Sequence, residues 1–204
     1  MINTLKNHWR AIFTNHDGLY DELFDTIITF YQEPHRHYHN ITHLYECFLW
    51  FDKIKDNLYR PDLVAIALFY HDVIYHPKSP TDEYDSSIIM KDDLKDILSD
   101  TDIAIIERYI LATKDHVNPL VGNDKRDLDY LLDIDLAILG SDFDRFNEYN
   151  HQIRQEYAWV NRFIYHIKRK SVLKGFYNKE RIYLTDYFYQ TLEHKARDNL
   201  KRCL

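Results

Sequence analysis

The chain has little cysteine, glycine or proline. Only 2 of its 204 residues are cysteines, at positions 47 and 203, which argues against a disulfide framework and against a Cys-based zinc site. Gly (4) and Pro (5) are almost as scarce, so there is little material for β-turns. These scarcities favour a helical protein in a reducing compartment.

Long apolar runs and an excess of positive charge are also missing. The longest apolar run, residues 63–70, is far too short to span a bilayer, and the first eight residues contain no apolar signal-peptide core. The formal net charge of −7 argues against general affinity for nucleic acid or anionic membranes. We expect a cytoplasmic protein without membrane or nucleic-acid partners, and the sequence is compatible with a homodimer.

What the chain does contain is apolar and aromatic residues at helical spacing. Hydrophobic residues make up 45% of it, with 17 Tyr and 11 Phe, and no segment alternates long enough to predict a strand. The pattern predicts a single all-α domain, a bundle of about nine helices, with a metal-binding core at about 30–140 and helices of 141–204 packed on it. The predicted helices cover about 2–15, 19–32, 41–56, 61–72, 82–98, 103–113, 125–139, 142–176 (capped by Ser141 and breaking near Asn161) and 186–202.

The adjacent pair His71–Asp72 lies inside an otherwise apolar segment. Burying an imidazole beside a carboxylate is costly unless something pairs with them. A bound metal ion is the most economical partner, because both groups are metal ligands. The alternative interpretation is a hydrogen bond between the two side chains at the end of a core helix.

Two further residues complete a candidate ligand set. His43 lies just inside the helix that Asn40 is expected to cap, and Asp135 lies in a mostly apolar helix. Two imidazoles and two carboxylates suit a divalent transition metal such as Mn, Co, Ni, Zn or Fe. Such an ion keeps a position for a water that becomes a nucleophile near neutral pH, next to Asp72. The spacing alone does not bring these residues together; only the fold can do so.

The order of these residues along a helical chain resembles the HD superfamily, and more narrowly a bacterial subgroup of predicted metal-dependent HD phosphohydrolases. The matching segments span nearly the whole chain: RHYHNITHL (36–44), LFYHDVIY (68–75), DEYDSS (82–87), LATKDH (111–116), LDIDLAILG (132–140), IRQEY (153–157) and EHKARDNL (193–200). The resemblance implies an HD-like helical bundle, a divalent ion (Mg included) held by the four residues above, and hydrolysis of a phosphoester. One departure is Asp82, where the resemblance leads us to expect Asn.

Two residues are candidates for catalysis beside Asp72. Glu83 follows the His–Asp pair across a short loop and is a candidate to orient the attacking water or to act as general acid or base; alternatively it is a helix N-terminal carboxylate favoured by the macrodipole. His116 follows a helix end, where functional groups concentrate. Its candidate roles are binding a second metal, donating to a phosphate or protonating a leaving group, and its alternative is an exposed loop histidine.

Four residues are candidates for contacts with a phosphorylated substrate: Arg36, His39, Lys114 and Arg154. The alternatives are that His39 packs with Tyr38 and that Arg154 belongs to a charged surface.

Three functions remain open at this stage. The first is a metal-dependent phosphohydrolase acting on a small phosphomonoester or nucleotide. The second is a di-iron oxygenase on the same scaffold, which needs about two more histidines; only His76 and His116 lie between Asp72 and Asp135. The third is a non-catalytic regulatory protein that binds a nucleotide.

Overall fold

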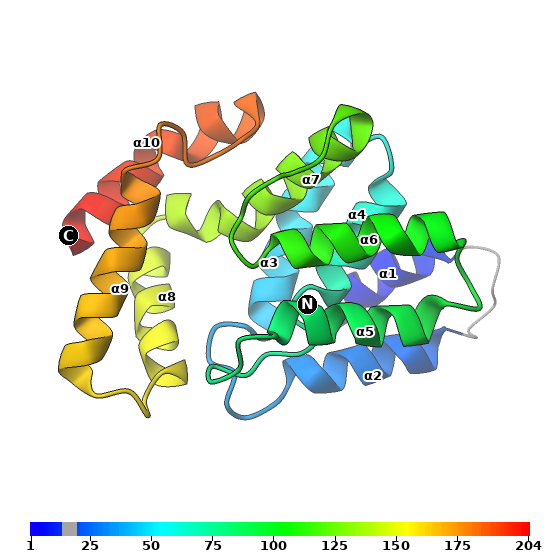
Figure 1. Cartoon of the computed structure of the whole chain (residues 1–204), viewed down its shortest axis with the longest axis horizontal. Helices are drawn as coiled ribbons and strands as arrows, with labels where there is room; N and C mark the ends of the chain where they lie inside the picture. Colours follow the sequence, from blue (N-terminus) through cyan, green and yellow to red (C-terminus); the bar gives the residue numbers. More distant parts are fainter. Residues whose placement is uncertain (14–19) are drawn as a thin grey trace. The chain divides into compact units, whose positions relative to one another are not determined.

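The computed structural model describes residues 1–13 and 20–204 and is all-helical over these ranges, which confirms the all-α part of the predicted fold class (Figure 1). The end of the first predicted helix and the start of the second fall partly on 14–19, outside the described residues. The α-helices are α1 (Ile2–Ile12), α2 (Asp21–Tyr31), α3 (Ile41–Ile54), α4 (Pro61–Tyr70), α5 (Asp82–Leu94), α6 (Asp100–Ala112), α7 (Gly122–Asp135), α8 (Phe143–Glu156), α9 (Arg162–Tyr177) and α10 (Asp186–Cys203), with short 3₁₀ helices η1 (Lys55–Asn57) and η2 (Leu136–Gly140). Among them, no helix is both long and apolar enough to cross a membrane.

The chain divides into two compact units, Met1–Leu132 and Asp133–Leu204, with the boundary in the last turn of α7. The predicted single domain, with its C-terminal helices packed on a metal-binding core, stays a prediction.

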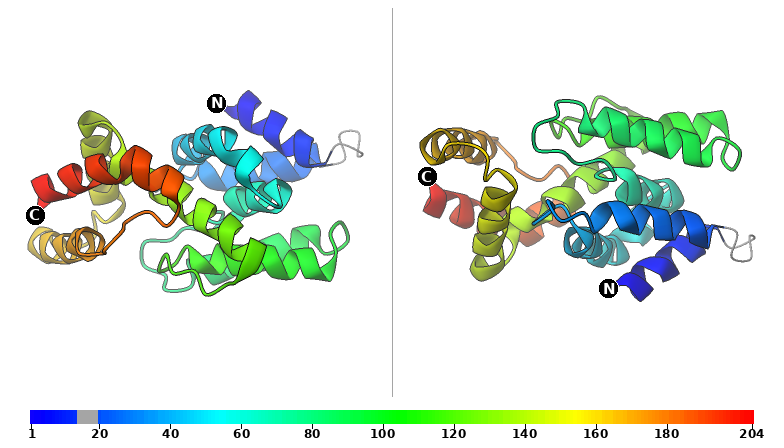
Figure 2. Two further views of the ribbon diagram at one scale, coloured as in Figure 1. Left: turned by 90° about the horizontal axis from the view of Figure 1, so that it is seen from above. Right: turned by 90° about the horizontal axis from the view of Figure 1, so that it is seen from below.

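Helix α4 is the centre of the first unit. All its residues from Leu63 to Tyr70 are buried, as expected for a helix without a polar face. Helices α5 and α6 lie side by side on one side of it, and α1, α2 and α3 lie on the other (Figures 1 and 2). The α1 side packs through aromatic rings, because Trp9 meets Phe69 edge-on with centroids 5.1 Å apart. Each such side chain contributes about 1.5–3 kcal/mol when fully buried, so α4 is held firmly.

Helix starts follow local capping chemistry. The side chain of Asn40 accepts a hydrogen bond from the backbone N–H of Thr42 at 2.8 Å, which confirms the predicted cap of α3. Helix α6 begins earlier than predicted, because the Ser99 hydroxyl accepts from the N–H of Asp102. Ser99 has extended backbone (φ −68°, ψ 150°), so the chain must leave helical conformation before it. Helix α5 ends at Leu94 instead of 98, and a hydrogen-bonded turn follows it, in which the N–H of Leu98 donates to the carbonyl oxygen of Leu94 at 3.0 Å.

The second unit contains one more helix than predicted. The long helix expected over 142–176 is two helices, since α8 ends at Glu156 and Asn161 caps α9 by accepting from the N–H of Phe163 at 2.9 Å. This is the break expected near Asn161, and it raises the total to ten α-helices in the described residues. The predicted cap Ser141 is wrong by one position: Asp142 is the N-cap of α8, without a side-chain hydrogen bond.

Helix α10 packs closely on η2 within the second unit. A Cβ atom added to Gly140 would lie 2.6 Å from the Cβ of Leu192, so only glycine permits this approach. Buried polar groups are paired here as well: the Asp133 carboxylate accepts from the N–H groups of Leu184 (2.7 Å) and Thr185 (2.8 Å). The unit is thus stabilised by close packing and by a carboxylate that accepts hydrogen bonds from backbone N–H groups of the segment before α10.

Candidate metal centre

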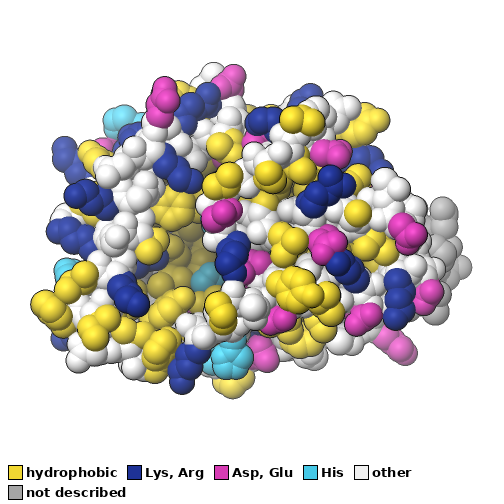
Figure 3. Space-filling model, in the orientation of Figure 1, with side chains coloured by type: hydrophobic (Ala, Val, Ile, Leu, Met, Phe, Trp, Pro, Cys, Tyr) yellow, Lys and Arg dark blue, Asp and Glu magenta, His cyan; other side chains and the backbone are white. Residues whose placement is uncertain are grey.

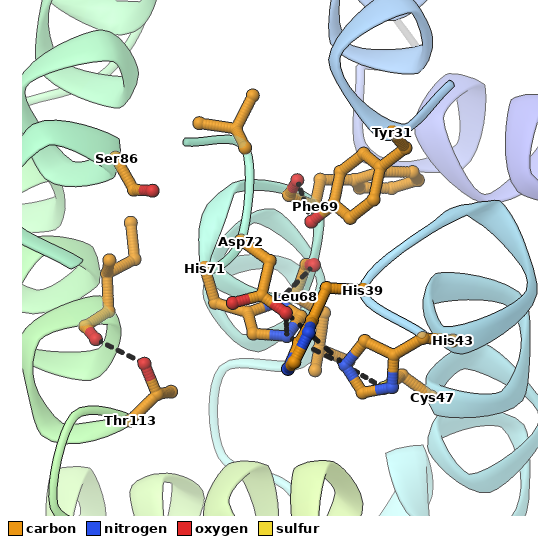
Figure 4. A network of polar contacts seen from close by, with 12 residues as sticks. Tyr31, His39, His43, Cys47, Leu68, Phe69, His71, Asp72, Ser86 and Thr113 are labelled. Carbon is orange, nitrogen blue, oxygen red and sulfur yellow. Dashed lines mark hydrogen bonds and ion pairs between the residues drawn. The ribbon is translucent and has the colours of Figure 1, made fainter. Parts of the chain in front are cut away.

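Three predicted ligands meet in the first unit. His43 lies in the first turn of α3, and His71 and Asp72 follow Tyr70, the last residue of α4. The two imidazoles are almost fully buried, whereas the side chain of Asp72 keeps 18% of its surface exposed. The cluster therefore has one edge that solvent or a substrate can reach. Figure 4 shows the three side chains pointing toward one another from α3 and the end of α4.

The ligating atoms of the three residues are nearly equidistant. Nε2 of His71 lies 3.2 Å from Nε2 of His43 and 3.2 Å from Oδ2 of Asp72. Nε2 of His43 lies 3.5 Å from the same carboxylate oxygen. The three atoms form a small triangle on which a single ion can sit.

The tautomer of His71 follows from its other nitrogen. Nδ1 lies 2.8 Å from the carbonyl oxygen of Leu68, which only accepts, so Nδ1 must carry the hydrogen and donate. In the neutral ring Nε2 then presents a lone pair to the cluster. This is the arrangement of metal-binding histidines, whose second ring nitrogen usually donates to a carbonyl or carboxylate.

The histidines around Asp72 lower the pKa of its carboxyl group. Burial acts to raise the pKa of its carboxyl group, but when His71 is protonated its charge and hydrogen bond, with the charges of protonated His39 and His43, outweigh this effect. The net result is a pKa well below the ordinary value of an aspartate. The carboxylate is therefore ionised at neutral pH and ready to bind a cation.

The donor set fits a divalent metal ion. Ligand bonds of about 2.0–2.2 Å in tetrahedral geometry place nitrogen and oxygen ligands about 3.3–3.6 Å apart. The observed separations of 3.2, 3.2 and 3.5 Å are close to this spacing. His43, His71 and Asp72 can thus hold an ion with little movement.

Arg36 braces the two segments that carry the ligands. Its side chain is fully buried, and its guanidinium donates to the carbonyl oxygens of His39 (3.2 Å), Asp72 (2.6 Å) and Val73 (2.8 Å), and to the Glu33 carboxylate (2.9 Å). One arginine thus joins the loop before α3 to the turn after α4. This is a positioning task, and the predicted contact of Arg36 with a phosphate stays a prediction.

Two further side chains, those of His39 and Cys47, lie beside His43. The ring of His39, a predicted substrate contact, stacks on Tyr75 with centroids 4.0 Å apart and lies 5.9 Å from the ring of His43. Sequence reasoning missed Cys47, whose Sγ lies 3.8 Å from Nε2 of His43 (Figure 4). The available signal was its position four residues after His43, which puts both on one helix face.

The remaining candidates of the first unit lie at the start of α5 and just after the end of α6. Glu83, in the first turn of α5, pairs with Lys114 at 3.1 Å. His116 follows α6 with a left-handed backbone (φ 53°), which is uncommon for a residue other than glycine. Asp82 accepts a hydrogen bond from the backbone N–H of His76 at 2.9 Å, so it braces the loop between the His–Asp pair and α5. The predicted catalytic roles of Glu83 and His116, and the phosphate contact of Lys114, stay predictions.

Two predicted site residues belong to the second unit. Asp135 is the last residue of α7, and Arg154 lies near the end of α8. The place of Asp135 in the ligand set and of Arg154 in substrate binding therefore stays a prediction.

Comparison with known proteins returned no relative: no family model, no curated protein and no solved structure matches the chain.

Proposed function

We propose that this protein is a metal-dependent phosphohydrolase that acts on a small phosphomonoester or nucleotide. The observation that carries the metal part is the convergence of three ligating atoms, at 3.2, 3.2 and 3.5 Å, in a buried site with one exposed edge. The choice of phosphoester hydrolysis is supported by the ordered segments that resemble the HD superfamily, and the like order of His43, His71, Asp72 and Asp135 supports a four-ligand site.

The residues divide the work as follows. His43 and His71 supply neutral nitrogen ligands. Asp72 supplies a negative charge that attracts the metal ion. A divalent ion bound there supplies Lewis acidity and lowers the pKa of a coordinated water. The exposed edge of Asp72 is the side from which a substrate would reach the ion, and its carboxylate would accept a hydrogen bond from a water there. Glu83 and His116 are the proposed acid and base groups to test first.

The metal part is tested by elemental analysis of the full chain purified without chelator. We expect close to one transition-metal ion per chain, and near zero in Asp72→Ala and His71→Ala. Asp92→Ala is the matched control, because Asp92 is an exposed carboxylate (69%) on α5. Metal-free protein, or variants that keep their metal, would refute the metal centre.

The phosphohydrolase part is tested with metal-loaded protein and a panel of nucleotides and phosphomonoesters. We expect release of inorganic phosphate from at least one substrate, lost in Asp72→Ala while circular dichroism shows an intact helical fold. Stoichiometric metal without turnover on any substrate would refute hydrolysis while leaving the metal centre standing. Ligand-induced thermal shifts in that case would favour the regulatory alternative, and two irons per chain with oxygen consumption would favour the oxygenase.

A further inference from the structure

A second cleft lies within the Asp133–Leu204 unit, where α8 ends and α9 begins. It is an open depression with a volume of about 710 Å³, lined by His151, Arg154, Asn161, Arg162, Phe163, Tyr165 and His166. Side chains bridge its two helices: Arg169 on α9 donates to the side chain of Asn150 on α8 at 2.9 Å. The cleft is thus a feature of this unit alone, with walls from two linked helices.

The lining of this cleft is cationic. It includes two arginines and two histidines, and no Asp or Glu is among its lining residues. This contrasts with the chain as a whole, whose formal net charge is −7. Figure 3 shows further Lys and Arg side chains along the side of the second unit where α9 lies, and Lys168, Lys170 and Lys174 are exposed there. Concentrated positive charge in a concave surface attracts anions.

Arg154 is held in place before any ligand arrives. Its guanidinium donates to the carbonyl oxygens of Tyr157 and Val160 and lies over the ring of Tyr165, 4.7 Å from the centroid. A guanidinium has five N–H groups, so donors remain for a ligand. A cation already fixed in this way loses little rotamer entropy when it binds, which favours affinity.

Arg162 and the start of α9 add to this site. Arg162 is exposed at the first position of the 16-residue helix, where the macrodipole favours an anion. The side chain of Asn161 already caps the N–H groups of Phe163 and Ile164. The ligand would therefore be held chiefly by the two guanidinium groups, which are suited to bidentate binding of a phosphate.

An aromatic ring lies beside the charged groups. Phe163 is 73% exposed, so its ring is open to a ligand in the cleft that it lines. An exposed phenyl ring stacks on a nucleobase regardless of which base it is. The cleft therefore combines arginines suited to a phosphate with an exposed aromatic ring suited to a base, and a nucleotide contains both groups.

We propose that this cleft is a nucleotide-binding site, with Arg154 and Arg162 binding the phosphate and Phe163 stacking on the base. The site lies apart from His43, His71 and Asp72 in the sequence and needs no metal ion. It is independent of the proposed phosphohydrolase function: binding in the presence of chelator belongs to this cleft, whereas turnover with metal belongs to the other centre.

The test is calorimetric titration of the full chain with AMP, adenosine and inorganic phosphate, at constant ionic strength and with chelator present. We expect AMP to bind more tightly than either fragment. Arg162→Ala should weaken AMP binding about ten-fold or more, since it removes charged hydrogen bonds. Phe163→Ala should weaken AMP about ten-fold and leave phosphate binding unchanged.

The controls lie on the same helix. Lys168→Ala removes one exposed positive charge from α9, and Val172→Ala removes an exposed apolar side chain; neither residue lines the cleft. Both should bind AMP as the wild type does. Equal weakening by Lys168→Ala and Arg162→Ala would overturn the proposal in favour of diffuse attraction. Phosphate binding as tight as AMP would overturn the nucleotide assignment, and AMP binding that requires metal would overturn the cleft as its site.

Discussion

Replacing Arg36 by lysine should damage both the fold and the metal centre, although the positive charge is kept. The guanidinium of Arg36 donates four hydrogen bonds, three of them to backbone carbonyls on the two segments that carry the ligands. A lysine has one nitrogen on a flexible stem and cannot reproduce this planar, divergent set. We therefore expect Arg36→Lys to leave about two buried carbonyl groups without a partner.

The size of the effect follows from those lost hydrogen bonds. Each buried polar group left unsatisfied costs about 1–3 kcal/mol, so the first unit should lose about 2–6 kcal/mol of unfolding free energy. Metal affinity should fall about 10–100-fold, as is typical when groups that orient ligands are removed. Urea unfolding followed by circular dichroism measures the first quantity, and titration with Co²⁺ or Zn²⁺ measures the second.

Arg10→Lys is the matched control. Arg10 pairs with Asp21 on the exposed surface of the same unit, where ion pairs contribute about 0–1 kcal/mol. This variant should stay close to the wild type in both assays. If Arg36→Lys also stayed within about 0.5 kcal/mol of the wild type and bound metal normally, the bracing role of Arg36 would be wrong.

Two further predictions concern other parts of the chain. The hydrogen bond and charge of Arg10 lower the pKa of Asp21 from its ordinary value of 3.8 to about 2. This pair therefore stabilises the fold above about pH 3.8 and ceases to do so as the pH falls through about 2. Carboxyl NMR titration of Arg10→Ala should show the pKa of Asp21 rising toward 3.8, and an unchanged value would contradict the pairing. In the second unit, Gly140→Ala should cost about 1–3 kcal/mol through overpacking, whereas Gly175→Ala, with nothing within 4 Å of its added Cβ, should stabilise α9 by about 0.5–1 kcal/mol. Thermal unfolding of the two variants decides this, and shifts of the same sign would refute it.

The helical fold was predictable because its signals are local. Apolar spacing sets the buried face of each helix, and Asn40 and Asn161 cap helices with their own side chains. Boundaries were less predictable where two signals compete. At the end of α5 the apolar residues 97 and 98 continue the pattern, but the helix ends at Leu94, and the chain becomes extended at Ser99, the cap of α6.

Chemistry alone pointed to His43, His71 and Asp72 as candidate ligands, but their supporting contacts could not be predicted. Arg36 lies 36 and 37 residues from the two carbonyls it binds after α4, and no periodicity in the sequence indicates such a contact. The sequence therefore indicated only a phosphate contact for Arg36, which stays a prediction, and gave no sign of its bracing role. Cys47 was missed for a related reason: a lone cysteine in an apolar helix usually indicates core packing.

The His71–Asp72 pair depends on where α4 ends. Adjacent side chains on a helix diverge by about 100°, so a His–Asp dipeptide within a helix does not aim both groups at one point. Here α4 ends at Tyr70 and its last carbonyl oxygens lack intrahelical partners. The ring of His71 donates to one of these, that of Leu68, at 2.8 Å, and turns Nε2 to within 3.2 Å of the Asp72 carboxylate. If α4 continued for another turn, the N–H of Asp72 would compete with the His71 ring for the Leu68 carbonyl. The end of the helix, as much as the dipeptide, therefore creates the candidate metal centre.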